Sequence, residues 1–310
     1  MRNSLLTICL FANISALADD ISEPSRGSSK WGKNDERGAA NNITPDRVIG
    51  AAKLIKTGVV YQLGRSYEAE MPQVSGRQYT LVIPQATPLI GRNRLSWHEE
   101  FVASQLGQVG TQLDGLGHVG IGDVYYNGFD QRQFVTPKGL AKLGVEKVGV
   151  FFSRGILLDI ALLKKKARLE KGYEVTDTDL KQASESQRTQ ISPGDCVFIH
   201  TGWGELWQTD RSQYASGEPG IGLTAARFLA QREITLVGFD NWGADAMPGS
   251  DTELFHPAHQ VLLTQNGIYI LENLDTSALA RDRVYEFAFF FAPLRLKGAT
   301  GSPGNPVAIR

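Results

Sequence analysis

Cysteine is almost absent from this chain. Of its 310 residues only two are cysteines, and Cys9 lies in a segment that we expect to be removed. Cys196 would then be alone, so an internal disulfide and a cysteine-rich zinc site are both excluded. Because Cys196 lies in the apolar run 195–199, we predict that it is a buried, small hydrophobic residue rather than a nucleophile.

Concentrated charge and long apolar runs are also missing. Lys and Arg number 32 against 33 Asp and Glu, which gives a net charge of −1, and no block of five or six like charges occurs. The longest basic run, 164–166, is too short to neutralise a nucleic-acid backbone, so we predict no nucleic-acid partner. No segment approaches the roughly 18 apolar residues of a membrane-spanning helix, and we predict no membrane partner.

Several common catalytic and nucleotide-binding motifs do not occur. The sequence has no Gly-x-x-x-x-Gly-Lys-[Ser/Thr], no His-Glu-x-x-His, no Gly-x-Ser-x-Gly, and no Gly-x-Gly-x-x-Gly after a predicted strand. These absences argue against a phosphate-binding loop, a zinc-protease helix, a serine-hydrolase turn and a dinucleotide-binding turn.

Residues 1–18 have the pattern of a secretory signal peptide. Arg2 supplies a short positive region, residues 5–14 are mostly apolar, and residues 16–18 (Ala-Leu-Ala) provide the small side chains of a cleavage site. We predict cleavage after Ala18 and export to the periplasm or out of the cell.

The remaining chain divides into an arm and one domain. Residues 19–45 are polar and rich in Ser, Gly and Asn, and we predict a tail or arm outside the core. Over residues 46–310, helix-like and strand-like segments alternate without a repeat or a clean linker, which predicts a single α/β domain. Helices are expected at 45–54, 162–172, 176–187, 223–231 and 256–265, strands at 59–63, 79–83, 148–152, 155–160, 196–200, 234–239, 268–271 and 285–292, and irregular structure at 106–122.

A dense polar cluster lies within the irregular segment. Gln108, Gln112, Asp114 and His118 follow one another at spacings of four, two and four, and four glycines surround them. Glycine lets the backbone approach closely, so these side chains can converge from a loop. An aspartate supplies a hard anionic oxygen, a histidine binds metal or shuttles protons, and glutamines offer neutral carbonyl oxygens. The same residues also suit a tight turn with a capping aspartate and a satisfied histidine.

A second cluster lies downstream. His259 and Glu272 are 13 residues apart and are separated by a predicted helix and an apolar strand, a connection that can bring both to one site. Glu272 ends the apolar run, which is an unusual position for a carboxylate without a partner. An exposed or N-capping glutamate at a strand end is the alternative.

The first cluster resembles a family signature. The metal-dependent cyclase superfamily, which includes bacterial kynurenine formamidase, isatin hydrolase and a trans-dienelactone hydrolase, carries His-x-Gly-Thr-His-x-Asp-x-x-x-His. Residues 108–118 match it as Gln-Val-Gly-Thr-Gln-Leu-Asp-Gly-Leu-Gly-His. Further family-like segments follow one another over nearly all of the chain beyond residue 18, at 31–32, 191–195, 200–203, 271–274 and 293–303.

The resemblance implies a fold, a chemistry and a set of site residues. The fold would be of the swivelling β/β/α type, and the reaction a hydrolysis at a carbonyl by metal-activated water, with one or two zinc or manganese ions. By position, Asp114, His259 and Glu272 would bind the metal, with Asp114 bridging where two ions are present. His118 would be the acid/base that protonates the leaving group. The resemblance also implies a homo-oligomer.

Two positions depart from the signature. Gln108 and Gln112 stand where the family has histidines. We keep both as candidate metal ligands, although an amide oxygen is a weaker donor to zinc than imidazole and favours harder metals such as manganese. Three arrangements stay open: weaker metal binding, one ion instead of two, or a water in place of a ligand.

The predicted function is that of a metal-dependent hydrolase whose small-molecule substrate is a cyclic or aryl amide, an ester or a lactone. The alternative is a catalytically inactive periplasmic protein that binds a small molecule on the same scaffold. Six aromatic residues near the motif segments are candidates for lining the substrate pocket: Trp97, Tyr125, Tyr126, Phe129, Trp203 and Trp242.

Overall fold

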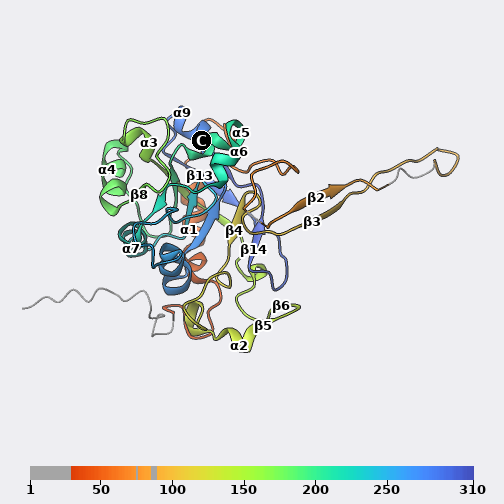
Figure 1. Ribbon diagram of the computed structural model, residues 1–310, viewed down its shortest axis with the longest axis horizontal. Helices are drawn as coiled ribbons and strands as arrows, with labels where there is room; N and C mark the ends of the chain where they lie inside the picture. The colour runs from red at the N-terminus through yellow and green to blue at the C-terminus, as the bar shows by residue number, and fades with distance from the viewer. Residues whose placement is uncertain (1–28, 75, 85–88) are drawn as a thin grey trace, which may run out of the picture.

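The framework of the fold is one large sheet. The computed structural model describes residues 29–74, 76–84 and 89–310. The central strands β7, β9, β11 and β12 are parallel, and the pairings on either side of this group are antiparallel. In spatial order the nine strands are β1 (Val60–Gln62), β15 (Val307–Ile309), β13 (Glu286–Phe291), β7 (Phe151–Asp159), β9 (Cys196–His200), β11 (Leu236–Phe239), β12 (Tyr269–Glu272), β4 (Gln112–Asp114) and β14 (Gly301–Pro303). Figure 1 labels β13, β4 and β14 of this sheet.

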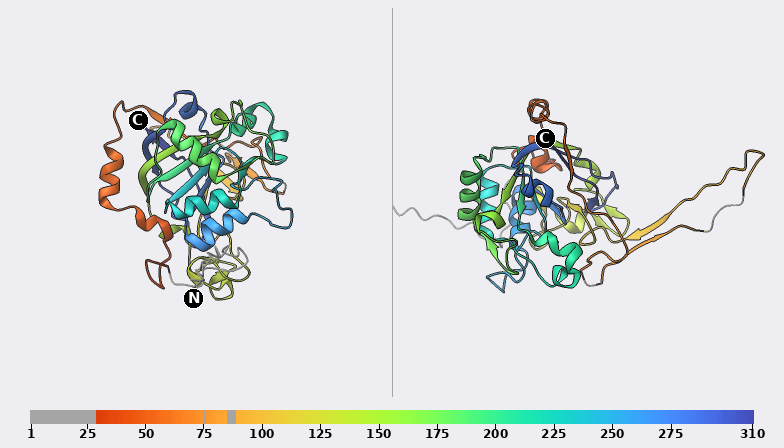
Figure 2. Two further views of the ribbon diagram at one scale, coloured as in Figure 1. Left: turned by 90° about the vertical axis from the view of Figure 1, so that its left-hand side faces the viewer. Right: turned by 90° about the horizontal axis from the view of Figure 1, so that it is seen from above.

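Helices cover one face of this sheet. Figure 2 shows α4 (Asp177–Gln187), α7 (Leu223–Gln231) and α8 (Pro257–His259) side by side, with a π-helical segment (Gln260–Gln265) continuing α8. The central strands are buried, so β9 and β11 lack the alternation of a half-exposed strand. The other described elements are the helices α1 (Pro45–Ala52), α2 (Gln131–Phe134), α3 (Ile160–Leu163), α5 (Leu206–Thr209), α6 (Arg211–Ala215) and α9 (Ser277–Arg281), the 3-10 helices Gly38–Asn42, Tyr126–Gly128, Val145–Lys147 and Trp203–Glu205, and the paired strands β5 (Val135–Thr136) with β6 (Gly139–Leu140) and β8 (Glu174–Val175) with β10 (Gly220–Ile221).

The α/β fold class is confirmed, and many predicted elements occur close to their expected positions. Helix α1 begins after Thr44, whose side chain accepts a hydrogen bond from the N–H of Arg47. Helix α4 begins with a capping box formed by Thr176 and Asp179. Cys196 is buried on β9, as predicted.

Three expectations about secondary structure are wrong. The helix expected over 162–172 is reduced to α3, because Lys165 adopts a left-handed φ of 56° soon after its end. The two strands expected between 148 and 160 form one strand, β7. The segment 106–122, expected to be irregular, contains β4, whose three residues are too few to show a period in the sequence.

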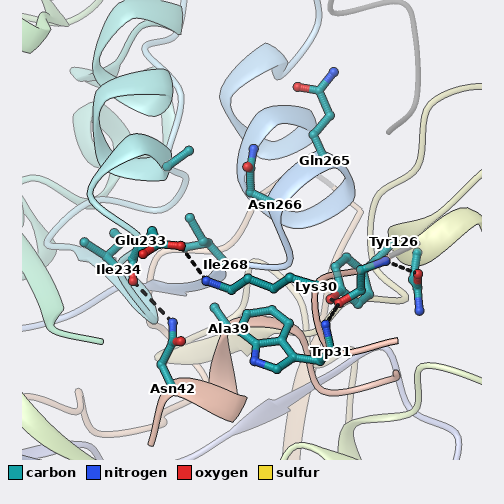
Figure 3. A pocket seen from close by; sticks show the side chains of 13 residues that line it. Lys30, Trp31, Ala39, Asn42, Tyr126, Glu233, Ile234, Gln265, Asn266 and Ile268 are labelled. Carbon is teal, nitrogen blue, oxygen red and sulfur yellow. Dashed lines mark hydrogen bonds and ion pairs between the residues drawn. The ribbon is translucent and has the colours of Figure 1, made fainter. Parts of the chain in front are cut away.

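Residues 29–45, expected to belong to an arm outside the core, pack onto the domain (Figure 3). Ala39 is buried, and its N–H donates to the carbonyl of Gly267 at 2.8 Å. Near the start of the segment, Lys30 pairs with Glu233 at 2.5 Å. The expectation of an arm is therefore wrong for these residues, because a small side chain lets their backbone dock against the body. Whether residue 46 marks a domain boundary stays a prediction.

The predicted signal peptide, 1–18, and the first part of the expected arm, 19–28, lie outside the described residues. Cleavage after Ala18 and export therefore stay predictions. Within the described residues, no helix combines the length and the apolar character needed to cross a membrane.

Strands β2 (Tyr79–Val82) and β3 (Phe101–Ser104) form an antiparallel hairpin outside the main sheet. Figures 1 and 2 show these two strands projecting from the body of the protein. The hairpin exposes large apolar side chains, among them Leu81 at 50% and Phe101 at 60%. Such a surface is uncommon on a monomer and is typical of a protein–protein contact.

Candidate metal centre

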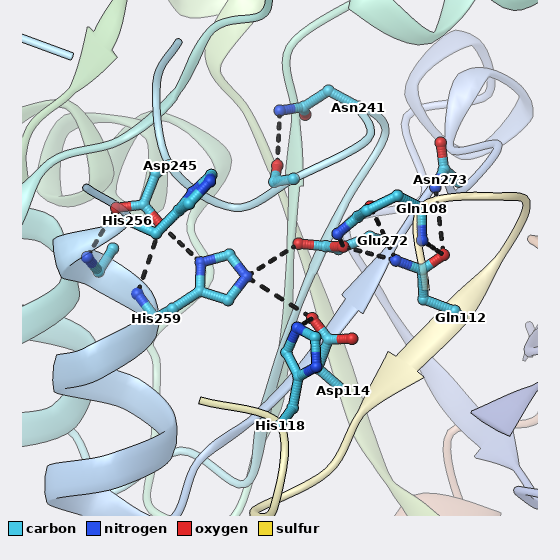
Figure 4. A network of polar contacts seen from close by, with 12 residues as sticks. Gln108, Gln112, Asp114, His118, Asn241, Asp245, His256, His259, Glu272 and Asn273 are labelled. Carbon is cyan, nitrogen blue, oxygen red and sulfur yellow. Dashed lines mark hydrogen bonds and ion pairs between the residues drawn. The ribbon is translucent and has the colours of Figure 1, made fainter. Parts of the chain in front are cut away.

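The register between β4 and β12 brings three polar side chains to one face of the sheet. Gln112 and Asp114 are two residues apart on β4, so both point to the same side. Glu272 on β12 pairs directly with Gln112 across the antiparallel ladder and faces the same way. Helix α8 supplies His259 from above this face, and the turn after β4 supplies His118 (Figure 4).

Three predicted ligands meet at the imidazole of His259. Its Nε2 lies 3.2 Å from Glu272 Oε1 and 3.6 Å from Asp114 Oδ2. His118 Nε2 lies 3.8 Å from the same Asp114 oxygen. Asp114, His259 and Glu272 are buried, whereas the His118 side chain is 29% exposed. Four of the six residues that the sequence placed in a site, Asp114, His118, His259 and Glu272, are therefore brought together.

The residues present fit a divalent cation. Asp114 Oδ2 and Glu272 Oε1 are buried and have no hydrogen-bond partner. Such an oxygen is costly to bury unless a donor or a cation compensates it. One ligand atom each from Asp114, His118 and His259 lie within 4.8 Å of one another. Carboxylate oxygens and imidazole nitrogens are ligands that zinc and manganese accept.

Electrostatics place protons on this cluster when no cation is bound. Burial alone would lower the pKa of His259, but the carboxylates of Asp114, Asp245 and Glu272 outweigh it and raise that pKa well above its usual value. Burial, reinforced by the charge of Asp114, raises the pKa of Glu272. For Asp114, the nearby His118 and His259 outweigh burial and lower the pKa.

Asp245 orients His259 and was missed by the sequence analysis. Its Oδ2 lies 2.6 Å from His259 Nδ1, and its Oδ1 accepts the N–H of Ala258 at 2.6 Å. A carboxylate on one imidazole nitrogen fixes the ring and leaves the other nitrogen for a metal. No signal in the sequence links the two residues, because Asp245 belongs to the loop after β11 and meets α8 only in the fold.

Gln108 and Gln112 also reach the centre, on the side of Glu272. Both amide nitrogens lie 2.7 Å from Glu272 Oε2. Gln108 and Gln112 are thus in contact with Glu272, a predicted metal ligand. That either glutamine itself binds a metal stays a prediction. A further buried carboxyl, Glu218, was not predicted; its Oε2 accepts the N–H of Gly243 at 3.0 Å.

A cavity of about 390 Å³ opens onto Asp114 and His118. Its other walls come from the turns that flank the β2–β3 hairpin and from the tail that contains β14. None of the six aromatic residues that were candidates for lining a substrate pocket lines this cavity. Trp203, for example, is buried in a separate apolar cluster.

Comparison with known proteins identifies the family. The Cyclase family model matches residues 44–246. The chain is similar to a crystal structure described as a novel cyclase, at 32% identity and a TM-score of 0.81, over 91% of this chain and 96% of that one. No curated protein matches the sequence. The chain therefore belongs to the Cyclase family.

More distant structures share the fold. Isatin hydrolase A from Labrenzia aggregata, bound to benzyl benzoate, is 20% identical, with a TM-score of 0.60 over 85% of this chain and 97% of its own. A structure from Bacillus stearothermophilus, described as a predicted metal-dependent hydrolase, is 19% identical, with a TM-score of 0.51 over 82% of this chain and 98% of its own.

Cation binding is expected to strengthen as the pH rises. In the cation-free protein the raised pKa values of His259 and Glu272 favour their protonated forms, and a bound cation needs both groups deprotonated. The affinity for Mn²⁺ should increase by up to about tenfold per pH unit for each proton released. Calorimetric titration in buffers of different ionisation enthalpy counts these protons, and a pH-independent affinity would contradict the assignment.

Replacing Asp245 by asparagine should weaken cation affinity about 10–100-fold, because the His259 ring loses the carboxylate that orients it. Asp240→Asn is the matched control. Asp240 is also a buried aspartate beside a histidine, with Oδ2 3.2 Å from His200 Nδ1, but neither residue belongs to the centre. Titration of both variants with Mn²⁺ tests the prediction, and equal losses in the two would indicate general destabilisation instead.

Proposed function

We propose that the protein is a metal-dependent hydrolase that cleaves a carbonyl C–N or C–O bond in a small cyclic or aryl amide, an ester or a lactone. One observation carries the proposal: two buried carboxylate oxygens without a hydrogen-bond partner, of Asp114 and Glu272, face one imidazole nitrogen of His259 beside an open cavity. The name of isatin hydrolase A, which has the same fold, supports the class of substrate.

The cofactor in this proposal is zinc or manganese, held by Asp114, His259 and Glu272. When bound, such a cation polarises a carbonyl and lowers the pKa of water towards neutrality. The chain itself supplies the fixed geometry, because Asp245 holds His259 and the β4–β12 ladder holds the two carboxylates.

His118 is the proposed acid/base. Its imidazole is partly exposed and borders the cavity, so it can hold a proton on the side where substrate enters. Proton delivery to the leaving nitrogen or oxygen makes bond cleavage easier. The volume of about 390 Å³ suits a small substrate.

Two substitutions separate the acid/base role from cation binding. His118→Gln should lower kcat by about 10²–10⁴-fold because proton delivery is lost, with cation content unchanged. Asp114→Asn should lose both the cation and turnover. The measurements are metal content by elemental analysis and hydrolysis of isatin, an N-formyl aryl amide and an aryl lactone.

The outcome also decides between an enzyme and a binding protein. Full activity of His118→Gln would contradict the proposed role of that residue. Thermal stabilisation by one of these compounds without turnover, at any metal tested, would favour the binding protein on the same scaffold.

We also propose that the protein forms a homo-oligomer through the β2–β3 hairpin. The hairpin's exposed apolar pairs, Leu81 opposite Val102 and Val82 opposite Phe101, are a surface suited to a second copy. Wild-type protein should have a mass in solution that is a multiple of the 33.9 kDa chain, less any removed leader, and Phe101→Ser should shift it towards one chain.

Light scattering after size-exclusion chromatography measures these masses. Phe255→Ser is the control, because Phe255 is 76% exposed but lies outside the hairpin. A monomeric wild-type protein at micromolar concentration would contradict the proposal, as would an unchanged mass for Phe101→Ser.

A further inference from the structure

Glu272 uses its two oxygens differently. Oε2 accepts one hydrogen bond from Gln108 Nε2 and one from Gln112 Nε2, each 2.7 Å long (Figure 4). Oε1 accepts none and faces His259. Two amide donors thus compensate the burial of Oε2, whereas Oε1 remains available to a cation at the centre.

The two amides also bind each other, which leaves neither amide oxygen free. Gln112 Nε2 donates to Gln108 Oε1 at 2.9 Å, and the backbone N–H of Gln108 donates to Gln112 Oε1 at 3.0 Å. Turning either amide over would set its oxygen against the Glu272 carboxylate, where two acceptors repel each other. The carboxylate therefore dictates the orientation of both amides.

The fold holds this arrangement in place. Gln112 and Glu272 are direct partners in the β4–β12 ladder, and Gln112 is 1% exposed. Gln108 adopts a left-handed φ of 60° in the turn before β4, which folds its backbone N–H back onto the Gln112 side chain. The ring of contacts among Gln108, Gln112 and Glu272 is called the glutamine clamp below.

We propose that the glutamine clamp consists of positioning residues, not ligands, and that it limits the centre to one divalent cation. A cation near Glu272 Oε1 meets Asp114 and His259, whose ligand atoms converge there. A cation near Oε2 would meet amide N–H groups, whose positive ends repel it. The inference rests on the proposed metal-dependent function, but it concerns the number of cations and not the reaction.

The test is a titration of the full chain, stripped with a chelator, with Mn²⁺ and separately with Zn²⁺. Calorimetry and elemental analysis should give one equivalent of cation for the wild-type protein. Gln112→Leu keeps a similar volume but removes the donors, and its cation affinity should be about tenfold weaker or more, because Glu272 can then turn.

Gln131→Leu is the matched control. Gln131 Nε2 also donates to a carboxylate, that of Asp123, at 2.7 Å, but on the exposed surface. This variant should bind one cation with wild-type affinity. Gln108→Leu tests the clamp if Gln112→Leu does not fold, because Gln108 is only partly buried.

Electron paramagnetic resonance of the Mn²⁺ form shows whether the bound ions are isolated or spin-coupled in pairs. A purely structural role of the clamp would not affect this property. Wild-type protein at full occupancy should show isolated ions and no spin-coupled pair. Zero or two equivalents in the wild-type protein would overturn the inference, as would wild-type affinity in both clamp variants. Binding of one cation with no hydrolysis of any carbonyl substrate would refute the proposed function and leave the clamp standing.

Discussion

The arrangement of the centre follows from the burial of three carboxylates around a single imidazole. Asp114, Asp245 and Glu272 are all buried, and all approach His259. Buried carboxylates are tolerated only where donors or cations compensate them. Backbone N–H groups at the start of α8 donate hydrogen bonds to Asp245. The side-chain amides of Gln108 and Gln112 donate to one oxygen of Glu272, Oε2. Two carboxylate oxygens, Asp114 Oδ2 and Glu272 Oε1, have no hydrogen-bond partner, and their position defines where a cation belongs.

The position of these oxygens depends on a close approach between β4 and its neighbouring strands. A Cβ on Gly301 would lie 2.4 Å from the carbonyl oxygen of Leu113, and one on Gly115 would lie 2.7 Å from that of Thr300. Because both contacts are with backbone, neither can relax by a side-chain movement. The glycines therefore let the segment that contains β14 lie directly against β4. This contact fixes the position of Asp114, which belongs to β4.

Most of the site could be predicted from the sequence because its residues stand in local patterns. Asp114 and His118 belong to a recognisable motif, and Glu272 ends an apolar strand after the helix of His259, so all four could be placed together. The direction of the glutamine amides could not be predicted, because it depends on the register between Gln112 and a strand 160 residues away. Asp245 could not be predicted for a similar reason, because it meets His259 only in the fold. The packing of residues 29–45 onto the domain was missed because the segment is polar overall, although it contains small residues such as Ala39.

The last strands of the chain have a consequence for how the protein is made. Strand β15 lies between β1 and β13, and β14 forms the outer neighbour of β4. During translation neither pairing can form until residues 301–309 have left the ribosome, so the nascent chain carries an incomplete sheet until then. The nine-stranded sheet is therefore completed only once residues 301–309 have been synthesised.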